Sequence, residues 1–418
     1  MNKIYATLFG YLTALSLYGQ VLPLDSVLQG IQAQHTELRM FDAQAKALDS
    51  YAKGAKSWEA PQVSAGFWMT PYNAKLWKPD ANSMISPIGL GQFMISGVQM
   101  VPNFKRQNAQ QKYMRQMASV ENAKKEAVQN QLFAEAKSNY FEWLVSKKKW
   151  SVVRENETLL QFMLKVAEGR YTYNQEKLGN VYKAKAALLT LDNEKILLED
   201  AMTQNRIALN TLLNRDKSTV FDIDTSFEIK HYESQTIDTA SIAAQRSDLH
   251  ALEQTIQVNK LKRELELSKG KLSYGIRFDH MQGFGYQPNL FTLMGMVNIP
   301  LVPWAAKEYK ANALGLHYEV QAIERQKETL LNQVSGQVQS LAKQVANKKR
   351  QLDLYQKGII PALKKNRQAA LSAYEQNTGD LLEVLDAQQS LQMAQLEYLN
   401  QLQALLLLQV AYEKELEK

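Results

Sequence analysis

The sequence of 418 residues contains no cysteine and few residues that break helices. The absence of cysteine excludes disulfide bonds, thiolate metal sites, cysteine nucleophiles and a lipid-modified N-terminal cysteine. Only 10 prolines and 19 glycines are present, and no proline lies between Pro102 and Pro288. So few breakers in a chain of this length indicate unusually long helices.

Long apolar runs are missing as well, except at the N-terminus. Lys3 is followed by an apolar run to Leu17 and then by Gly19, which is typical of a secretory signal peptide over residues 1–19. The alternative is a buried first helix. No later segment offers about 18 consecutive apolar residues, and the mean hydropathy is −0.36. A helical inner-membrane protein is therefore excluded, whereas membrane-spanning strands are still allowed.

The net charge of +7 comes without a long basic tract. The two short clusters, Lys147 to Lys149 and Lys348 to Arg350, lie in helical patterns and are interpreted as solvated faces, so no nucleic-acid partner is expected. No two of the five histidines are four residues apart, and no catalytic triad or phosphate-binding loop is recognisable. We therefore expect no enzyme activity, no cofactor and no metal site.

A turn signal between two long helical patterns occurs twice. The later copy spans Tyr374 to Ala387, and the earlier copy runs from Tyr171 to Ala184 at the same spacing. The copies are offset by 203 positions here, by 201 positions at Pro102 and Pro303, and by 209 positions at Gly66 and Gly275, so the register is nearly constant. Such a constant register indicates an internal duplication, with small insertions expected in loops. Each half reads as a helix, two strands, a long helix, a sharp turn and a shorter helix.

The periodicities predict the following organisation. Repeat 1 covers residues 20–213, with a first helix at 23–60, strands at about 61–70 and 90–100, and long helices at about 103–173 and 181–213. An inter-repeat, equatorial segment covers 214–240. Repeat 2 covers 241–418, with a helix at about 242–268, strands at about 272–282 and 290–300, and long helices at about 304–375 and 380–416.

Each predicted strand has one apolar face. In residues 290–300, for example, Phe291, Leu293 and Val297 alternate with Thr292 and Asn298. A sheet can cross hydrocarbon only when it is closed, with its apolar face toward lipid. Four strands cannot close around a lumen, so several chains must contribute. Helices of some 70 residues are about 100 Å long and too polar for lipid, so they must project from the membrane. The pattern therefore predicts a hollow conduit whose strands contact membrane lipid.

These features resemble the outer membrane efflux protein, or TolC, family. The resemblance rests on the duplicated element order, on the strand ends at Val101-Pro102 and Val302-Pro303, and on Tyr374, Asn377 and Val384 to Ala387. The family includes the CusC/CzcC-like cation-efflux branch, which is the branch considered for this chain. The resemblance implies a mainly α fold with membrane β structure, in which a homotrimer forms a twelve-stranded outer-membrane β-barrel continuous with a long periplasmic α-helical barrel.

The resemblance also implies a function. The chain is expected to be a passive exit duct of a tripartite efflux system, located in the outer membrane and extending into the periplasm. Its implied partners are a periplasmic adaptor (membrane fusion) protein and an inner-membrane transporter of the RND type. The alternative is a periplasmic adaptor or a structural coiled-coil protein, which would also pair long helices. An adaptor should lack the alternation that predicts lipid-facing strands.

Two acidic residues are the candidates for a pore constriction. Mapped through the resemblance, Glu383 and Asp386 lie where similar proteins place carboxylates facing the axis. Repeated in several chains, they would attract cations. The alternative for Glu383 is a capping box with Asp380 as N-cap, a duty that Asp386 does not share.

The turns supply the candidates for adaptor contact at the periplasmic tip: Tyr171, Asn174, Leu178, Tyr374, Asn377 and Gly379. Core packing is the alternative for the tyrosines. The two asparagines occupy positions where a glycine is often found in the family, and asparagine is the next-best residue for a left-handed backbone. Both turns are therefore expected to contain one left-handed residue.

The strands supply the candidates for the outer lumen. Arg277 and Asp279 lie on the polar face of their strand, with an ordinary cross-strand ion pair as the alternative. Met294 and Met296 also face inward, where thioethers could meet soft cations or simply fill space.

Overall fold

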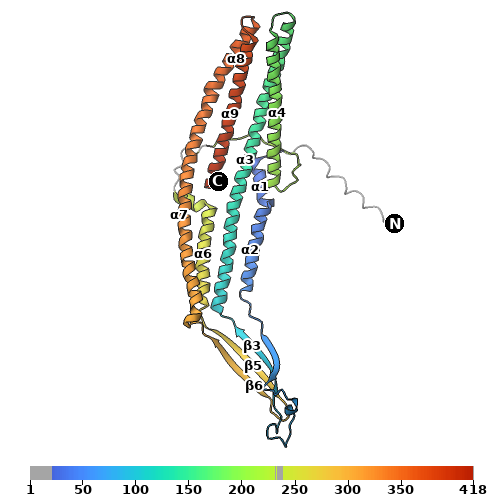
Figure 1. Cartoon of the computed structure of the whole chain (residues 1–418). Helices are drawn as coiled ribbons and strands as arrows, with labels where there is room; N and C mark the ends of the chain where they lie inside the picture. Colours follow the sequence, from blue (N-terminus) through green and yellow to red (C-terminus); the bar gives the residue numbers. More distant parts are fainter. Residues whose placement is uncertain (1–20, 231, 233–238, 418) are drawn as a thin grey trace, which may run out of the picture. The chain divides into compact units, whose positions relative to one another are not determined.

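The computed structural model describes residues 21–230, 232 and 239–417 (Figure 1). The signal peptide predicted at residues 1–19 lies outside these residues. The elements in chain order are β1 (Val21–Leu22), α1 (Leu24–Gln34), α2 (Thr36–Gly54), β2 (Gln62–Trp68), the 3₁₀ helix η1 (Ala74–Trp77), β3 (Gln92–Val101), α3 (Phe104–Thr172), α4 (Leu178–Leu212), β4 (Asp222–Ile223), α5 (Thr239–Gln245), α6 (Ser247–Ser268), β5 (Ser273–Gly283), β6 (Leu290–Asn298), α7 (Pro303–Leu354), the π-helical segment η2 (Tyr355–Ile359), α8 (Ile360–Glu375) and α9 (Leu381–Leu416).

The chain is mainly helical, and its four longer strands, β2, β3, β5 and β6, pair in antiparallel fashion, which confirms the prediction of a mainly α chain with a smaller β part. The longest helix, α3, contains 69 residues. Within the described part of the chain, none of the helices combines the length and the apolar character that crossing a membrane requires.

The compact units of the molecule cut across the two sequence repeats. One unit, here called the helical unit, contains the described residues up to Met40 together with 125–247 and 330–417. The other, here called the strand unit, contains 41–124 and 248–329. The strand unit takes one portion from each repeat and the helical unit takes two, so corresponding segments of the two halves belong to the same unit.

The strand unit is built on one sheet with the order β2-β3-β5-β6, in which all neighbours are antiparallel. The two repeats meet at its centre, where β3 of the first half pairs with β5 of the second. The apolar face of β5 is exposed in the single chain at Tyr274, Ile276 and Phe278. An exposed apolar face is consistent with strands that lie against lipid.

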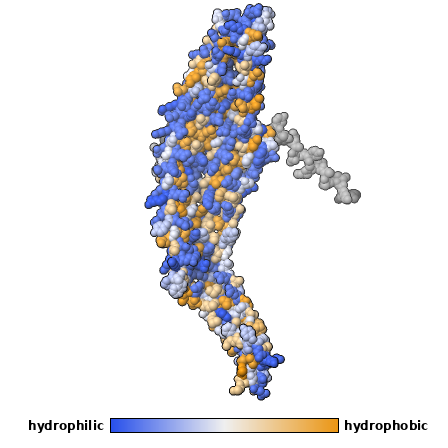
Figure 2. Space-filling model, viewed as in Figure 1, coloured by the Kyte–Doolittle hydropathy of each residue, from blue (hydrophilic) through white to orange (hydrophobic). Residues whose placement is uncertain are grey.

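The helical unit contains two hydrophobic clusters. The larger one joins α1, α3, α7 and α9, and its fully buried side chains include Leu144, Leu405 and Tyr412. The smaller one joins α3, α4, α8 and α9 near the two turns, around Val153, Leu191 and Leu381 among others. Full burial of one such side chain contributes about 1.5–3 kcal/mol. Figure 1 shows α8 and α9 side by side, and hydrophilic residues cover most of the visible helical surface in Figure 2.

The inter-repeat segment is held against this unit by short contacts. β1 and β4 form a parallel two-residue pair, and Tyr140 Oη of α3 donates to the carbonyl oxygens of Leu22 (3.2 Å) and Asp224 (3.0 Å). Lys147 Nζ forms an ion pair with Asp222 at 2.7 Å. One of the lysines interpreted as a solvated face is therefore used inside the chain.

Two helices predicted to be continuous are interrupted. The helix predicted at 23–60 is wrong as a single element, because His35 has an extended backbone that separates α1 from α2. The helix predicted at 304–375 contains the π-helical segment, in which the Ile360 N–H donates to the Tyr355 carbonyl, five residues back. Pro361 follows directly, and it has no N–H with which to continue the usual ladder.

The π-helical segment lies in a stretch where the offset between the two repeats changes. The offset between the repeats grows from 201 to 203 positions between Pro102 and Tyr171 in the first half, and between Pro303 and Tyr374 in the second. Both stretches are helical almost throughout. The expectation that insertions fall only in loops is therefore wrong here, because the second half absorbs its extra residues within the helix. The five-residue hydrogen bond of the π-helical segment accommodates one of these two residues.

Candidate functional site at the paired helical turns

The first turn, between α3 and α4, closes around one left-handed residue. Asn174 has φ of 59°. The Gln175 N–H donates to the Arg170 carbonyl at 2.9 Å, and the Asn174 N–H donates to the Tyr171 carbonyl at 3.0 Å. This pair of bonds is a Schellman motif, which satisfies the carbonyl groups left free at the helix end.

The second turn, between α8 and α9, repeats this geometry. Asn377 has φ of 56°. The Thr378 N–H donates to the Ala373 carbonyl at 2.9 Å, and the Asn377 N–H donates to the Tyr374 carbonyl at 3.1 Å. The left-handed backbone expected from the two asparagines is therefore present in both turns. Asparagine tolerates this conformation because its short polar side chain can bond locally.

The two turns are joined through Tyr374. Its side chain is 5% exposed, and its hydroxyl donates to Glu176 Oε2 of the other turn at 3.1 Å. The Arg170 guanidinium lies 4.1 Å from the centre of the Tyr374 ring and donates to the Tyr374 carbonyl at 3.2 Å. Burial raises the pKa of Tyr374, and the bond to Glu176 raises it further. The hydroxyl therefore stays protonated and able to donate at neutral pH.

A second bridge runs through Asn180. Its amide nitrogen lies 2.9 Å from Glu176 Oε1 and 2.9 Å from Asp380 Oδ1. The same Asp380 oxygen accepts from the Leu382 N–H at 3.3 Å, so Asp380 is the N-cap of α9 as expected. No hydrogen bond to the Glu383 carboxylate occurs in the part of the chain that the structure describes. The hydrogen bond from the Asp380 backbone N–H to the Glu383 carboxylate, which would complete a capping box, is therefore missing. Glu383 does not take part in capping α9.

Glu383 and Asp386 lie exposed on successive turns of α9. Both line a groove of about 530 Å³, whose other walls are Asn366, Ala369, Ala370, Ala373, Ala387 and Ser390. Gly379 lies close by, since a Cβ atom there would be 3.0 Å from Ala373 Cβ and 3.4 Å from Glu383 Oε2. The glycine permits this close approach between the turn and the end of α8.

Asp386 also borders a second groove, of about 480 Å³, together with Lys183 of α4. Sequence reasoning missed this lysine. Lys183 stands at the position that corresponds to Asp386 when the two copies are aligned at an offset of 203. A position-by-position comparison of the copies would have found it. The predicted acidic constriction therefore has a basic residue on the same groove.

The remaining turn candidates are exposed. Tyr171 is 42% exposed and Leu178, the first residue of α4, is 44% exposed. Asn174 and Asn377 are exposed as well. The two tyrosines therefore differ, because Tyr374 is packed whereas Tyr171 is free to contact another molecule.

Arg277 and Asp279 form an ion pair within one strand. Arg277 Nε lies 2.9 Å from Asp279 Oδ1, and Ser96 Oγ of β3 donates to the same carboxylate. The alternative of a cross-strand ion pair is wrong, because both charged residues belong to β5. Asp279 is only 2% exposed, whereas Arg277 is half-buried. Arg277 is thus the more accessible of the two lumen candidates.

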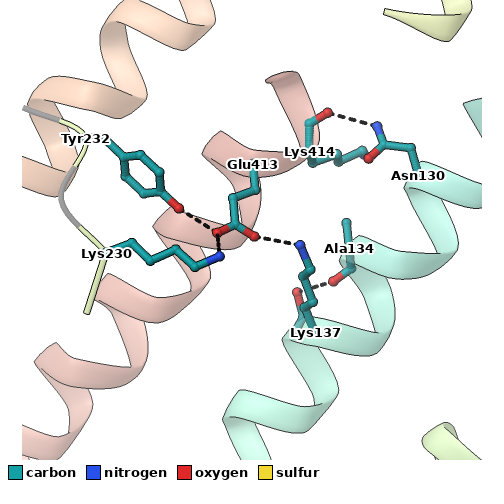
Figure 3. Close-up of polar contacts among 8 residues, drawn as sticks. Asn130, Ala134, Lys137, Lys230, Tyr232, Glu413 and Lys414 are labelled. Atoms are coloured by element: carbon teal, nitrogen blue, oxygen red, sulfur yellow. Dashed lines mark hydrogen bonds and ion pairs between the residues drawn. The ribbon is translucent and has the colours of Figure 1, made fainter. Parts of the chain in front are cut away.

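A buried charge cluster at the far end of α9 was not predicted (Figure 3). Glu413 accepts from Lys137 Nζ at 2.6 Å, from Lys230 Nζ at 2.7 Å and from Tyr232 Oη at 2.5 Å. Burial alone would raise the pKa of Glu413, but these three donors outweigh it and lower the pKa. The cluster fastens the inter-repeat segment to α9. Lys230 and Tyr232 follow no helical pattern, so their pairing with Glu413 left no signal in the sequence.

Residues 27–215 match the model of a protein family described as outer membrane efflux protein. This match covers 189 of the 418 residues, so the first repeat of the chain is similar to the outer membrane efflux protein family. No curated protein matches the chain. Together with the shared fold described below, the match supports an outer membrane efflux channel that extends into the periplasm and that is not enzymatic. The alternative of an adaptor or structural coiled coil is thereby set aside.

Solved structures agree with the family over nearly the whole chain. CusC aligns with a TM-score of 0.74 at 14% identity, covering 94% of this chain and 91% of that one. The outer membrane protein VceC from Vibrio cholerae aligns with a TM-score of 0.73 at 15% identity, covering 94% and 95%. The MtrE channel of Neisseria gonorrhoeae aligns with a TM-score of 0.70 at 15% identity, covering 94% and 88%. At these identities the likeness establishes a shared fold, not a shared cargo.

Proposed function

We propose that three copies of this efflux channel form the exit duct of a tripartite system, passively conducting cargo received from an inner-membrane transporter. The observation that carries this proposal is the sheet. Its edge strands β2 and β6 have no partner on their outer sides within the described residues, while its apolar face is exposed. Unpaired edges are unfavourable in lipid, so β2 of one copy would pair with β6 of the next until the sheet closes.

A stripe on α4 supports association of the helical units. Tyr182, Leu189 and Ile196 recur every seven residues and are 62%, 62% and 65% exposed in the single chain. A seven-residue apolar repeat marks the contact face of a packed helix pair. The described residues of the chain itself leave this stripe uncovered, and in the proposed trimer a neighbouring copy covers it.

The paired turns are the proposed place of adaptor docking. Tyr171, Asn174, Leu178 and Asn377 present exposed side chains there, and Gly379 shapes the adjoining surface. Tyr374 belongs to this surface as an internal support. The periplasmic adaptor would bring an inner-membrane pump of the RND type, and the cation-efflux branch is the proposed assignment.

Glu383 and Asp386 are the proposed constriction. Neither carboxylate has a hydrogen-bond or ion-pair partner among the described residues, and both are exposed on α9. Free carboxylates repeated by three copies around one aperture attract cations and resist anions. Arg277, at the proposed outer lumen, is the basic counterpart.

Fractionation and oligomeric state test the proposal. The protein should fractionate with the outer membrane and run as a trimer in mild detergent. The variant Leu189→Glu/Ile196→Glu, which places charges on the α4 stripe, should weaken the trimer. Thr190→Glu, at an exposed position about 100° around the same helix from Leu189, should not. Recovery of the wild-type protein as a soluble periplasmic monomer would contradict the proposal.

A further inference from the structure

The sheet of the strand unit carries methionine on one face only. The register places Met94 opposite Met281, and Met100 opposite Gly275, which in turn lies opposite Met296. Met294 lies opposite Arg277. The methionine face is defined by these five residues: Met94, Met100, Met281, Met294 and Met296. It is the face that also carries Arg277 and Asp279, and β2, β3, β5 and β6 hold no methionine on the other face.

The aromatic residues of these strands lie mainly on the other face of the sheet. Phe67, Phe93, Tyr274, Phe278 and Phe291 all lie on the face without methionine. Trp68, at the end of β2, is the one aromatic residue of these strands on the methionine face. Sites for apolar organic molecules are usually lined by aromatic side chains. A surface that is rich in thioethers but poor in aromatic rings therefore does not fit an apolar cargo.

Two of the five methionines lie against Gly275, and a third lies at the next position along the same face. A Cβ atom placed on this glycine would lie 2.7 Å from Met100 Sδ and 3.0 Å from Met296 Cε. Both side chains therefore occupy the space above the glycine. Met294 lies two residues before Met296 on β6 and so projects from the same face. We call these residues, Met100, Met294 and Met296, the methionine trio.

The charges near the trio are balanced. Arg277, beside Met294, is neutralised by Asp279 in the ion pair described above. A cation that reaches the trio therefore meets uncharged sulfur atoms without a nearby unpaired positive charge. Thioethers are soft ligands, which select soft metal ions such as Cu(I) over Na⁺, K⁺ or Mg²⁺.

We propose that the methionine face is a binding site for soft monovalent cations, Cu(I) or Ag(I), with the methionine trio as its centre. The site rests on the proposed exit-duct function, since it places these cations among the cargo. Neutral thioethers need no deprotonation before they bind, unlike thiols or protonated histidine. Several weak sites along one wall suit conduction, because an ion must enter each site and also leave it.

The test is a titration of the purified trimer with silver nitrate in chloride-free buffer, followed by calorimetry. The variant Met100→Leu/Met294→Leu/Met296→Leu keeps side-chain volume nearly constant. Its Ag⁺ affinity should fall by at least about tenfold, since even outer-shell changes at metal sites cost that much. The control Met40→Leu/Met84→Leu removes exposed methionines outside the sheet and should bind like the wild type. Elution as a trimer verifies that each variant is folded.

The outcomes separate the two proposals. An unchanged Ag⁺ affinity in the folded triple variant overturns the site. A triple variant that keeps Ag⁺ binding but loses an apolar fluorescent probe assigns the face to apolar cargo and overturns it as well. Failure of the wild-type trimer to conduct KCl in a planar bilayer would refute the exit duct, whereas Ag⁺ binding is measured independently of conduction.

Discussion

The two helical turns have the same backbone and opposite chemistry. Both close by a Schellman motif with asparagine in the left-handed position. At corresponding positions, however, the second turn has Glu383 and Asp386 where the first has Asn180 and Lys183. After the duplication, both copies therefore kept the backbone geometry that reverses the chain. It let the side chains diverge, so that one turn supplies free carboxylates and the other supplies bridges and a cation.

The tyrosines show the same divergence in packing. Tyr374 is buried between the turns, and its counterpart Tyr171 is exposed. The Arg170 guanidinium stacks on Tyr374, whereas the residue that corresponds to Arg170 in the second turn is Ala373. One tyrosine therefore serves as a support and the other is available to a partner.

The largest expected effect is a difference in stability between variants of these two tyrosines. Tyr374→Ala removes a buried aromatic side chain and the donor to Glu176, so it should destabilise the helical unit by about 3–5 kcal/mol. Tyr171→Ala, the matched control, should change stability by less than about 0.5 kcal/mol because its side chain is exposed. Thermal unfolding of the two variants measures the difference. Equal effects would show that the two turns are equivalent in packing.

The next prediction extends the comparison to the other end of the same helices. Glu413 corresponds to Asn210, whose amide donates to the Thr219 carbonyl at 2.9 Å. Both residues fasten the inter-repeat segment, but only Glu413 does so with charge. Glu413→Gln should cost about 3 kcal/mol, because it removes the buried negative charge that Lys137 and Lys230 both contact. Glu121→Gln, which breaks the more exposed pair with Lys124, should cost less than about 1 kcal/mol.

Acid titration checks the same cluster. The pKa of Glu413 is lowered from 4.5 in the folded chain. A lowered pKa contributes stability that is present above 4.5 and is lost as the pH falls through the folded value. The melting temperature of the wild type should therefore drop more steeply in acid than that of Glu413→Gln. Parallel curves for the two proteins would exclude a charged Glu413 as the fastening group.

A smaller effect on stability is expected at the left-handed asparagine that both turns contain. Asn174→Val and Asn377→Val should each destabilise by about 1–2 kcal/mol, because a left-handed backbone brings Cβ too close to the following carbonyl. Asn174→Gly and Asn377→Gly are the controls, and they should be nearly neutral since glycine adopts this conformation freely. Chemical unfolding measures all four. A large cost at only one turn would contradict the equivalence of the two backbones.

The sequence predicted those features that follow from local chemistry. The asparagines predicted left-handed turns, and Asp380 predicted a helix start. The period of two predicted strands with an apolar face. Features that depend on distant partners were missed. The burial of Tyr374 depends on Arg170 and Glu176 of the other turn.

Two further errors have identifiable causes. Pro361 lacks an N–H and could have warned of the π-helical segment, but a helical pattern continues on both sides of it. A cross-strand ion pair was the wrong alternative for Arg277 and Asp279, because residues two apart on one strand share a face. The ion pair within β5 follows from that rule alone.

The smallest expected effect concerns the opposite charges on the groove beside α9. If Asp386 faces the pore, Asp386→Asn should lower the preference for cations, and Lys183→Asn should raise it, because Lys183 borders the same groove. Each unit charge contributes about 1 kcal/mol at 4 Å in water-like surroundings, so each permeability ratio should change by less than about fivefold. Reversal potentials in a KCl gradient measure both variants, with Lys185→Asn as a control from the same helix. Shifts of the same sign for Asp386→Asn and Lys183→Asn would show that conduction does not sense this groove, and would leave the two turns different in sequence but equal in function.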